Sequence, residues 1–206
     1  MNIKSLPFAE LNLSKCPDGL IPAVIQDDRT LEVLMLGYMN QEAYEKSLEE
    51  GRVTFYSRTR STLWIKGETS GNYLNIVSVT VDCDNDTLLV RVNPIGPTCH
   101  TGARSCFRQD GDSAEGFIRQ LEAVIQTRHA EMPEGSYTTK LFNKGVGKIS
   151  QKVGEEAVET IIEAAAGNYD AMIPEIADMI YHLLVLLEAT GKSISDIEEE
   201  LVKRHS

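Results

Sequence analysis

Short alternating runs of apolar and polar residues mark the first half of the chain, as expected of half-buried β-strands. After the second run, Asn40 is a suitable N-cap and Gly51 a suitable stop for a helix that ends near residue 50. Residues 93–112 hold several glycines and two prolines and are expected to form a loop. The predicted strands are 20–26, 32–39, 53–57, 62–66, 74–82 and 87–92.

The second half of the chain changes to a helical spacing. Phe117, Leu121 and Val124 recur at intervals of three and four residues after a polar stretch. Asp112 or Ser113 is the expected N-cap of this helix. Further helices are predicted at about 137–166, 170–190 and 195–205.

Glycine, proline and capping residues indicate where these helices begin and end. Gly167 and Gly191 are natural helix stops. Ser195 and Glu198 have the spacing of a capping box for the last helix. Pro174 is expected in the first turn of its helix, where proline is tolerated.

The change of period predicts two domains that meet in the polar stretch Gln109–Asp112. Residues 1–112 are assigned to an N-terminal β-rich α+β domain and residues 113–206 to a C-terminal all-α helical bundle. The most apolar stretch, Ile176–Leu187, is interrupted by an aspartate and a histidine, so no membrane association is predicted. The N-terminus lacks the apolar core of a signal peptide, and we expect a cytoplasmic protein.

The net charge of −11 narrows the partners and cofactors to be expected. A nucleic-acid binder depends on clustered Lys and Arg, so no nucleic-acid partner is predicted. An acidic protein that handles phosphates needs cations to bridge the two, which makes metal sites the feature to seek. In a reducing cytoplasm, free thiols are more often metal ligands or nucleophiles than disulfide partners. The chain has four cysteines: Cys16, Cys83, Cys99 and Cys106.

Three carboxylates stand at alternate positions, Asp82, Asp84 and Asp86. In an extended segment they point to one face, where their mutual repulsion favours a bound cation. An EF-hand loop would need Gly and Glu where Thr87 and Asn93 stand, so that interpretation fails. The alternative is an acidic turn between two strands, without a metal.

Cys83, Cys99 and Cys106 offer three thiolates, the ligand count of a catalytic zinc ion whose open position activates water. Their spacing is not that of a zinc finger, which uses paired Cys-x-x-Cys motifs. Alternatively, the cysteines are small buried apolar side chains. His100 is a candidate general base or ligand, and the alternative is an ordinary packed or surface histidine.

A basic segment in the first half adds candidate substrate contacts. Arg58, Arg60 and Lys66 offer charge and bidentate donors for phosphate groups. Trp64 could stack on a base, and neighbouring glycines allow close backbone approach. A solvated basic hairpin is the alternative.

The block Pro22–Phe107 resembles the phosphoribosyl-AMP cyclohydrolases nearly end to end. Five motifs carry the resemblance, in the order Gly37–Asn40, Tyr56–Ser61, Leu63–Gly71, Val81–Asp86 and Cys99–Phe107. The resemblance implies a homodimer with one zinc ion per chain, whose zinc ligands come from both chains. The implied zinc ligands are Cys83, Cys99 and Cys106, and the implied magnesium ligands are Asp82, Asp84 and Asp86.

The reaction implied by this resemblance opens an adenine ring, already alkylated on N1, between N1 and C6. His100 is the candidate for proton transfer to the ring. The candidate substrate contacts are Ser57, Arg58, Arg60, Trp64, Lys66, Gly67, Glu68 and Ser70.

Two acidic pairs stand out in the second half, Glu156 with Glu159 and Glu175 with Asp178. The members of each pair are three residues apart, so each pair shares one helix face. Two such faces packed together would hold Mg²⁺ and, through it, a polyphosphate. The alternative is two solvated acidic faces.

Apolar neighbours argue against solvated faces. Ile161 and Ile162 flank the acids and predict that they lie near the bundle core, where like charges are costly without a metal. Lys152 is a candidate phosphate contact or half of a surface ion pair, and Glu155 is a candidate catalytic carboxylate. His182 is interpreted as structural.

The spacing E-x-x-E followed by E-x-x-D resembles the all-α nucleoside triphosphate pyrophosphohydrolase superfamily. Within it, Ser136–Phe142 and Lys148–Glu159 resemble phosphoribosyl-ATP pyrophosphohydrolases, over about residues 114–203. The resemblance implies that water attacks the α–β anhydride of phosphoribosyl-ATP and releases pyrophosphate, with Mg²⁺ holding the substrate. The product is the substrate implied for the other half, which gives two successive steps of histidine biosynthesis.

Two other classes of protein fit parts of these patterns. One is a general nucleotide-cleansing pyrophosphohydrolase with a zinc-stabilised accessory domain. The other is a metal-sensing or scaffold dimer without catalytic activity. A closed four-ligand metal site would favour the scaffold, whereas three cysteines and an open position favour an enzyme.

Overall fold

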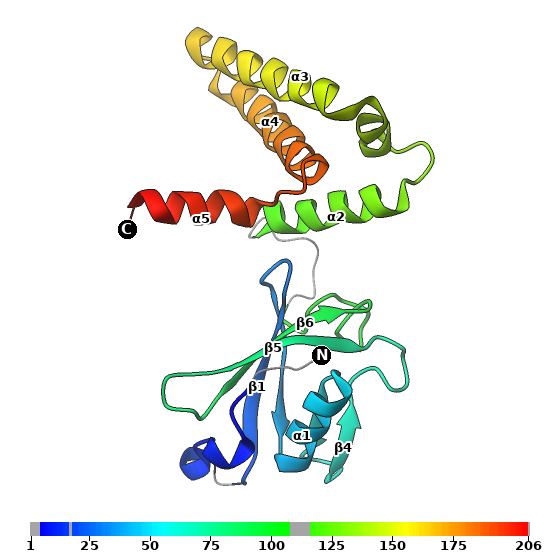
Figure 1. Ribbon diagram of the computed structural model, residues 1–206, viewed down its shortest axis with the longest axis vertical. Helices are drawn as coiled ribbons and strands as arrows, with labels where there is room; N and C mark the ends of the chain where they lie inside the picture. The colour runs from blue at the N-terminus through cyan, green and yellow to red at the C-terminus, as the bar shows by residue number, and fades with distance from the viewer. Residues whose placement is uncertain (1–4, 17, 108–115, 206) are drawn as a thin grey trace. The chain divides into compact units, whose positions relative to one another are not determined.

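The computed structural model describes residues 5–16, 18–107 and 116–205 (Figure 1). The chain separates into two compact units, Met1–Gly116 and Phe117–Ser206. The first unit is rich in strands and the second is helical, which confirms the predicted fold class. The predicted boundary at Gln109–Asp112 and the two candidate N-caps beside it lie outside the described residues.

A four-stranded sheet forms the centre of the first unit, in the order β2-β1-β6-β5. Its strands are β1 (Ile21–Asp27), β2 (Val33–Met39), β5 (Leu74–Val81) and β6 (Leu88–Pro94). β1 runs parallel to β6, and the other two pairings are antiparallel. Every second residue of β1 is buried, so the alternation seen in the sequence places one face of this strand on the core.

A helix and a hairpin complete this unit. Helix α1 (Gln41–Glu50) begins after Asn40, whose side chain accepts from the Ala43 N–H at 2.8 Å, and ends at Gly51 in the left-handed conformation, as predicted. The hairpin consists of β3 (Thr54–Ser57) and β4 (Thr62–Ile65). A Cβ atom on Gly37 would lie 2.3 Å from the Phe55 ring, so glycine at this position lets the hairpin pack on β2.

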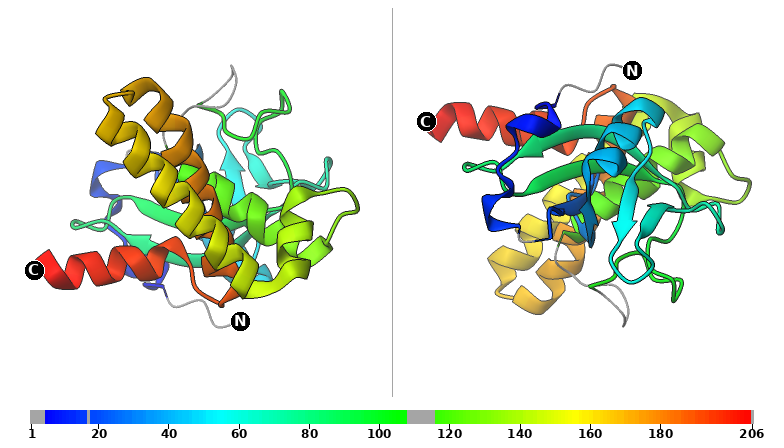
Figure 2. Two further views of the ribbon diagram at one scale, coloured as in Figure 1. Left: turned by 90° about the horizontal axis from the view of Figure 1, so that it is seen from above. Right: turned by 90° about the horizontal axis from the view of Figure 1, so that it is seen from below.

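Four helices form the second unit: α2 (Phe117–Glu131), α3 (Tyr137–Ala166), α4 (Tyr169–Ala189) and α5 (Ile194–His205). Figures 1 and 2 show α3 and α4 side by side as a helical hairpin. The hydrophobic core of this unit includes Ile125, Ile149 and Leu184, all almost fully buried. None of the helices in the described residues is long and apolar enough to cross a bilayer.

α3 is broken, although its sequence predicts one continuous helix. Gly145 has φ 77° and ψ 173°, a conformation outside the helical region that is favourable only for glycine. The helix therefore changes direction at this residue. The helical spacing of the apolar positions does not reveal such a break.

Two predictions about helix ends were wrong by a few residues. α4 begins at Tyr169, so Pro174 is its sixth residue and lies beyond the first turn. The capping interaction of α5 joins Ser193 to Asp196, whose carboxylate accepts from the Ser193 N–H at 2.8 Å. Ser195 and Glu198 instead contact Arg119 of α2.

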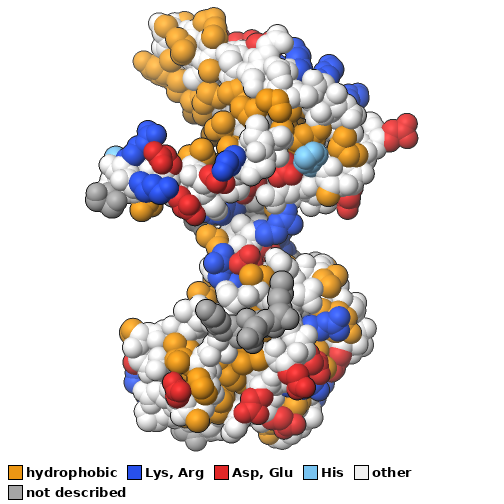
Figure 3. Space-filling model, in the orientation of Figure 1, with side chains coloured by type: hydrophobic (Ala, Val, Ile, Leu, Met, Phe, Trp, Pro, Cys, Tyr) orange, Lys and Arg blue, Asp and Glu red, His pale blue; other side chains and the backbone are white. Residues whose placement is uncertain are grey.

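The isoleucines beside the first acidic pair, Glu156 with Glu159, are also not where the sequence placed them. Ile161 is 65% exposed and Ile162 is 56% exposed. Figure 3 shows hydrophobic side chains gathered on this part of the α3–α4 hairpin. The prediction that they surround the acids in a core is wrong within a single chain, because helical spacing does not say which face is covered by the rest of the same chain.

Candidate active sites

The turn between β5 and β6 brings Asp82, Asp84 and Asp86 together. Each offers a carboxylate oxygen, and the three oxygens lie within 4.8 Å of one another. Asp82 Oδ1 accepts from the N–H groups of Asp86 (3.0 Å) and Thr87 (3.1 Å), which shapes the turn. The segment is therefore an acidic turn between two strands, not the extended segment assumed from the alternate spacing, and it is the turn that gathers the three carboxylates.

A lysine from the N-terminal segment already reaches this cluster. The Lys15 ammonium forms ion pairs with Asp84 and, at 2.9 Å, with Asp86. These carboxylates raise the pKa of Lys15. Asn12 fixes the approach, because its N–H donates to the Asn85 carbonyl at 2.8 Å.

The loop after β6 carries Cys99 and Cys106, and each thiol shifts the pKa of the other. Thr101 Oγ1 donates to Cys99 Sγ at 3.2 Å and lowers the pKa of that thiol. Burial raises the pKa of Cys106. His100 Nδ1 lies 3.8 Å from Cys99 Sγ. Paired sulfurs, one already favoured as a thiolate, are a donor set that suits a soft cation such as zinc.

Cys83 does not join these two sulfurs in the described part of one chain. It is exposed in the turn that precedes β6, whereas Cys99 follows the other end of that strand. β6 has seven residues, so its two ends are about 20 Å apart. No group of three potential ligands found among the described residues contains a cysteine.

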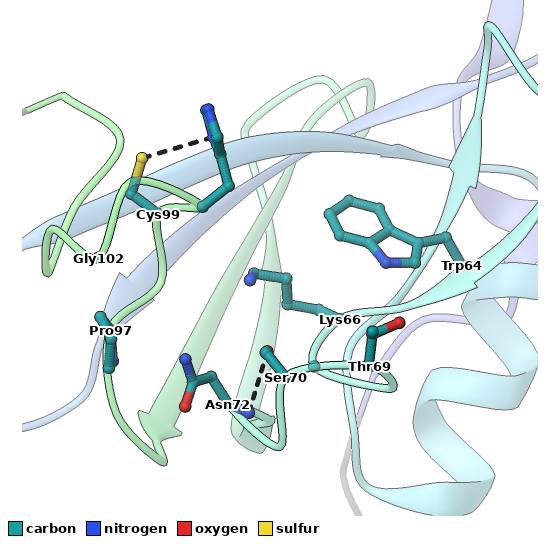
Figure 4. Close-up of a pocket in the computed structure, with 10 residues that line it drawn as sticks. Trp64, Lys66, Thr69, Ser70, Asn72, Pro97, Cys99 and Gly102 are labelled. Carbon is teal, nitrogen blue, oxygen red and sulfur yellow. Dashed lines mark hydrogen bonds between the residues drawn. The ribbon is translucent and has the colours of Figure 1, made fainter.

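A cavity of about 320 Å³ adjoins the Cys99 loop (Figure 4). Its volume is at the lower end of the range for small-molecule sites. In Figure 4 the Lys66 side chain extends between Trp64 and Cys99. The residues that line it are Trp64, Lys66, Gly67, Thr69, Ser70, Asn72, Pro97, Cys99, His100 and Gly102.

Four of the eight predicted substrate contacts therefore line the cavity, namely Trp64, Lys66, Gly67 and Ser70. The other four, Ser57, Arg58, Arg60 and Glu68, are not among its lining residues. Arg58 lies over the Tyr38 ring at 3.8 Å, and Arg60 lies 6.0 Å from the Trp64 ring. Stacking on aromatic rings explains both arginines without a ligand.

Asn72 is a cavity residue that the sequence analysis missed. A Cβ atom on Gly67 would lie 2.5 Å from the Asn72 carbonyl, and one on Gly96 would lie 2.7 Å from Asn72 Oδ1. Both glycines have positive φ, at 94° and 96°. Glycine at these two positions leaves room for the Asn72 backbone beside Gly67 and for the Asn72 side chain beside Gly96.

In the helical unit, Glu156 of α3 meets Glu175 and Asp178 of α4. Their carboxylate oxygens lie within 4.8 Å of one another. Glu156 is only 5% exposed. Burial, together with the charge of Glu159, raises the pKa of Glu175. Glu159 itself is exposed and lies outside this three-ligand group. The structure therefore brings together three of the four predicted acids.

Lys152 and His182 flank the buried glutamate. Lys152 pairs with Glu155 at 2.9 Å and with Glu156 at 2.6 Å, and the second contact lowers the pKa of Glu156. His182 is buried against Tyr181, and its Nε2 lies 3.8 Å from Glu156 Oε1. Burial lowers the pKa of His182. The histidine is thus a packed residue, as predicted, but one that touches the site.

Comparison with known families matches each unit separately. A family model for phosphoribosyl-AMP cyclohydrolase matches residues 35–108. A family model for phosphoribosyl-ATP pyrophosphohydrolase matches residues 118–205. The fold and the two candidate sites thus define a two-unit hydrolase with a different chemistry in each unit.

Several relatives match this chain over nearly their whole length. A protein of Bacteroides thetaiotaomicron is 54% identical over 96% of this chain and 97% of its own. One from Escherichia coli is 54% identical over 91% and 92%, and one from Photobacterium profundum is 53% identical over 92% and 94%. Each is described as histidine biosynthesis bifunctional protein HisIE. This chain belongs to that family of bifunctional histidine-biosynthesis hydrolases.

Proposed function

We propose that the helical unit releases pyrophosphate from phosphoribosyl-ATP and that the strand-rich unit then opens the adenine ring of the product between N1 and C6. The observation that carries the proposal is the separation of two different donor sets. Carboxylates gather on α3 and α4, and thiols gather beside a cavity in the other unit. We place both reactions in the cytoplasm.

The acids of the helical unit fit Mg²⁺. Three carboxylate oxygens lie within 4.8 Å of one another, and burial together with the neighbouring charges of Glu159, Glu156 and Asp178 raises the pKa of Glu175. Glu156, Glu175 and Asp178 would hold the ion, with Glu159 as a further ligand. When bound, Mg²⁺ neutralises phosphate charge and orients the anhydride.

Side chains beside this cluster handle the phosphates and the water. Lys152 presents its ammonium next to Glu156, where it can meet a phosphate oxygen. Glu155 lies on the other side of that ammonium and stays ionised, because the same ion pair lowers its pKa. We assign Glu155 to orienting the attacking water.

The cysteine loop fits zinc, which would be held by Cys99 and Cys106 of one chain and Cys83 of a second. When bound with an open position, zinc lowers the pKa of a water molecule toward neutrality. Trp64 offers an aromatic surface to the base, and the largely buried Lys66 offers positive charge to a phosphate. His100 lines the same cavity and serves proton transfer to the ring.

A homodimer follows from two independent features. The thiol set is incomplete within the described part of one chain. In addition, the α3–α4 hairpin exposes a group of large apolar side chains: Val158, Ile161, Ile162 and Ile173, each more than half exposed. Clustered exposed apolar surface of this kind is typical of a protein interface. Asp82, Asp84 and Asp86 would hold a further Mg²⁺ near the first unit's site.

A coupled assay with the full-length chain tests the proposal. Phosphoribosyl-ATP is supplied, and pyrophosphate release and ring opening are followed separately. Cys99→Ser should abolish ring opening and leave pyrophosphate release intact. Glu156→Gln should do the reverse when phosphoribosyl-AMP is supplied for the second step.

Each variant has a matched control in the same unit. Cys16→Ser removes a thiol outside the cavity lining, and Glu163→Gln removes a carboxylate of α3 outside the three-acid group. Both controls should retain both activities. If Cys99→Ser opened the ring at the wild-type rate, the thiols would take no part in ring opening; if wild type released pyrophosphate but opened no ring, the strand-rich unit would be an accessory domain.

A further inference from the structure

Arg104 lies between the two cysteines of the loop and pairs with two buried carboxylates. One guanidinium nitrogen, Nη2, lies 2.8 Å from Asp27 Oδ2, and Nε lies 2.9 Å from Glu32 Oε2. The carboxylate side chains are only 4% and 7% exposed. Nη2 also donates to Thr30 Oγ1 at 3.2 Å. The guanidinium therefore hydrogen-bonds to Asp27 and Thr30 through Nη2 and forms an ion pair with Glu32 through Nε, an arrangement that suits arginine and not lysine.

The partners of Arg104 belong to a turn that is itself fixed. Asp27 and Glu32 bracket the connection between β1 and β2, and the Asp27 N–H donates to the Glu32 carbonyl at 2.9 Å. Asp27 Oδ1 accepts from the N–H groups of Arg29 (2.9 Å) and Thr30 (3.0 Å). The second oxygen of the same carboxylate takes Arg104. Arg104 thus ties the cysteine loop to a rigid corner of the sheet.

Backbone bonds next to Arg104 extend this tie to both cysteines. The Arg104 carbonyl accepts from the N–H of Thr98, the residue before Cys99, at 3.2 Å. On the other side, the Cys106 N–H donates to the Leu34 carbonyl at 2.7 Å. Between them, the fully buried Ser105 hydroxyl donates to the Val33 carbonyl at 2.7 Å. A displacement of Arg104 would therefore move both sulfurs relative to each other.

We propose that Arg104 is a positioning residue, which sets the separation of the Cys99 and Cys106 thiolates and so prepares this chain's half of the zinc site. The inference rests on the proposed function, because it presumes that these sulfurs bind zinc. Supporting residues around metal ligands typically contribute ten- to hundredfold to metal affinity. A residue that only stabilised the fold would leave zinc affinity unchanged in the folded protein.

The chain offers a matched control in Arg91. Its Nε lies 2.9 Å from Asp28 Oδ1, in an ion pair on the same sheet, and its Nη2 donates to the Asp28 carbonyl at 3.1 Å, so both contacts are with Asp28 and not with the cysteine loop. Arg104→Lys and Arg91→Lys therefore each replace a guanidinium that forms an ion pair. Only Arg104 belongs to the cysteine loop. Glu32→Gln provides a milder loosening of the Arg104 contact, should Arg104→Lys fail to fold.

The experiment uses the full-length protein and measures zinc affinity by competition with a chromophoric chelator. The thiolate charge-transfer absorption of the Co²⁺-loaded protein serves as a second readout. We expect Arg104→Lys to bind zinc about tenfold to hundredfold more weakly than wild type and to alter the Co²⁺ spectrum. Glu32→Gln should show a smaller loss in the same direction, and Arg91→Lys should match wild type in both readouts. For ring opening, kcat should fall in Arg104→Lys with little change in KM.

Two results would overturn the inference in distinguishable ways. If wild type binds zinc tightly and the Arg104→Lys and Glu32→Gln variants bind it as tightly as Arg91→Lys, Arg104 has no positioning role. If wild type itself binds no zinc through its cysteines, the proposed zinc site fails, and the inference fails with it.

Discussion

The two units assemble their charged clusters in different ways. In the helical unit, Glu156 comes from one helix and Glu175 and Asp178 from the next, and a single hairpin brings them together. In the strand-rich unit, the cysteines lie on segments at opposite ends of β6. Candidate ligands on two adjoining helices meet within one chain, whereas candidate ligands at opposite ends of a strand do not.

This difference shows what sequence spacing can and cannot establish. An i, i+3 pair reports a shared helix face directly, since the helix fixes the geometry. Cysteines that are 16 positions apart, such as Cys83 and Cys99, report only that both residues are present. Their meeting depends on the path of the chain between them and on neighbouring chains.

The largest expected effect tests whether the helical cluster is limited to three acids. Asp178→Asn should reduce pyrophosphate release by at least about a hundredfold, because it removes a charged ligand while nearly preserving shape. Glu159→Gln should have a much smaller effect, since Glu159 lies outside the three-ligand group. Steady-state rates at saturating Mg²⁺ measure both. Equal losses in the two variants would return Glu159 to the ligand set.

The next prediction concerns the pH dependence of metal affinity at the helical cluster. Because the pKa of Glu175 is raised, this carboxyl becomes protonated above the ordinary glutamate range as pH falls. Metal binding must then displace a proton, so affinity should fall by up to about tenfold per pH unit below that pKa and level off above it. Glu156 does not contribute in this window, because the Lys152 ion pair lowers its pKa.

Titration of the helical cluster with Mn²⁺, between about pH 5 and pH 8, provides the measurement. Glu175→Gln should bind the ion more weakly but lose most of the pH dependence. A slope that persisted in this variant would assign the proton to another group.

A smaller effect is expected at the aspartate turn of the strand-rich unit. Lys15 competes with any divalent ion for Asp84 and Asp86, so Lys15→Gln should raise Mg²⁺ affinity there by about two- to fivefold. The gain should shrink at high salt, where exposed charges are screened. Calorimetric titration measures it, with Lys46→Gln as the control, because Lys46 forms an exposed ion pair with Glu50. An unchanged affinity in Lys15→Gln would mean that the lysine does not compete.

The smallest effect is expected from cutting the chain between the units. Fragments 1–112 and 113–206 should each fold and keep the activity of their own unit within about twofold, because each has its own hydrophobic core. Separate expression with each fragment's own substrate tests this. A requirement for the intact chain in either reaction would contradict the two-domain interpretation.

Much of the fold could be predicted from local patterns. Alternating residues gave all six strands to within a few positions, and Asn40 and Gly51 gave both ends of α1. The break at Gly145 and the shifted cap at Ser193 could not be predicted, because several residues nearby satisfy the same local rule. Tertiary contacts, such as the ion pair of Arg119 with Glu198, determine which of these residues caps the helix.

The candidate sites were predictable where residue type alone limits the chemistry. Three of the four helical acids, Glu156, Glu175 and Asp178, gather as their spacing indicated, whereas the aspartates gather through an acidic turn, the alternative to an extended segment. For Arg58 and Arg60 the substrate contacts stay predictions, since a guanidinium that suits phosphate also suits an aromatic ring, and only the folded unit shows that Tyr38 and Trp64 lie near them. Asn72 was missed because an amide in a polar loop has no distinctive spacing.

The position of β6 between Cys83 and Cys99 has a genetic consequence under the proposed two-chain assembly. Alleles encoding Cys83→Ser and Cys99→Ser should each fail to support ring opening, yet they should complement each other when expressed together. In a mixed dimer the two lesions fall in the same site, and the other site keeps all its thiols. Random association would leave about a quarter of the sites intact, by the two-fold symmetry of the dimer. Two lesions within one segment, Cys99→Ser and Cys106→Ser, should not complement, because neither chain then supplies an undamaged pair.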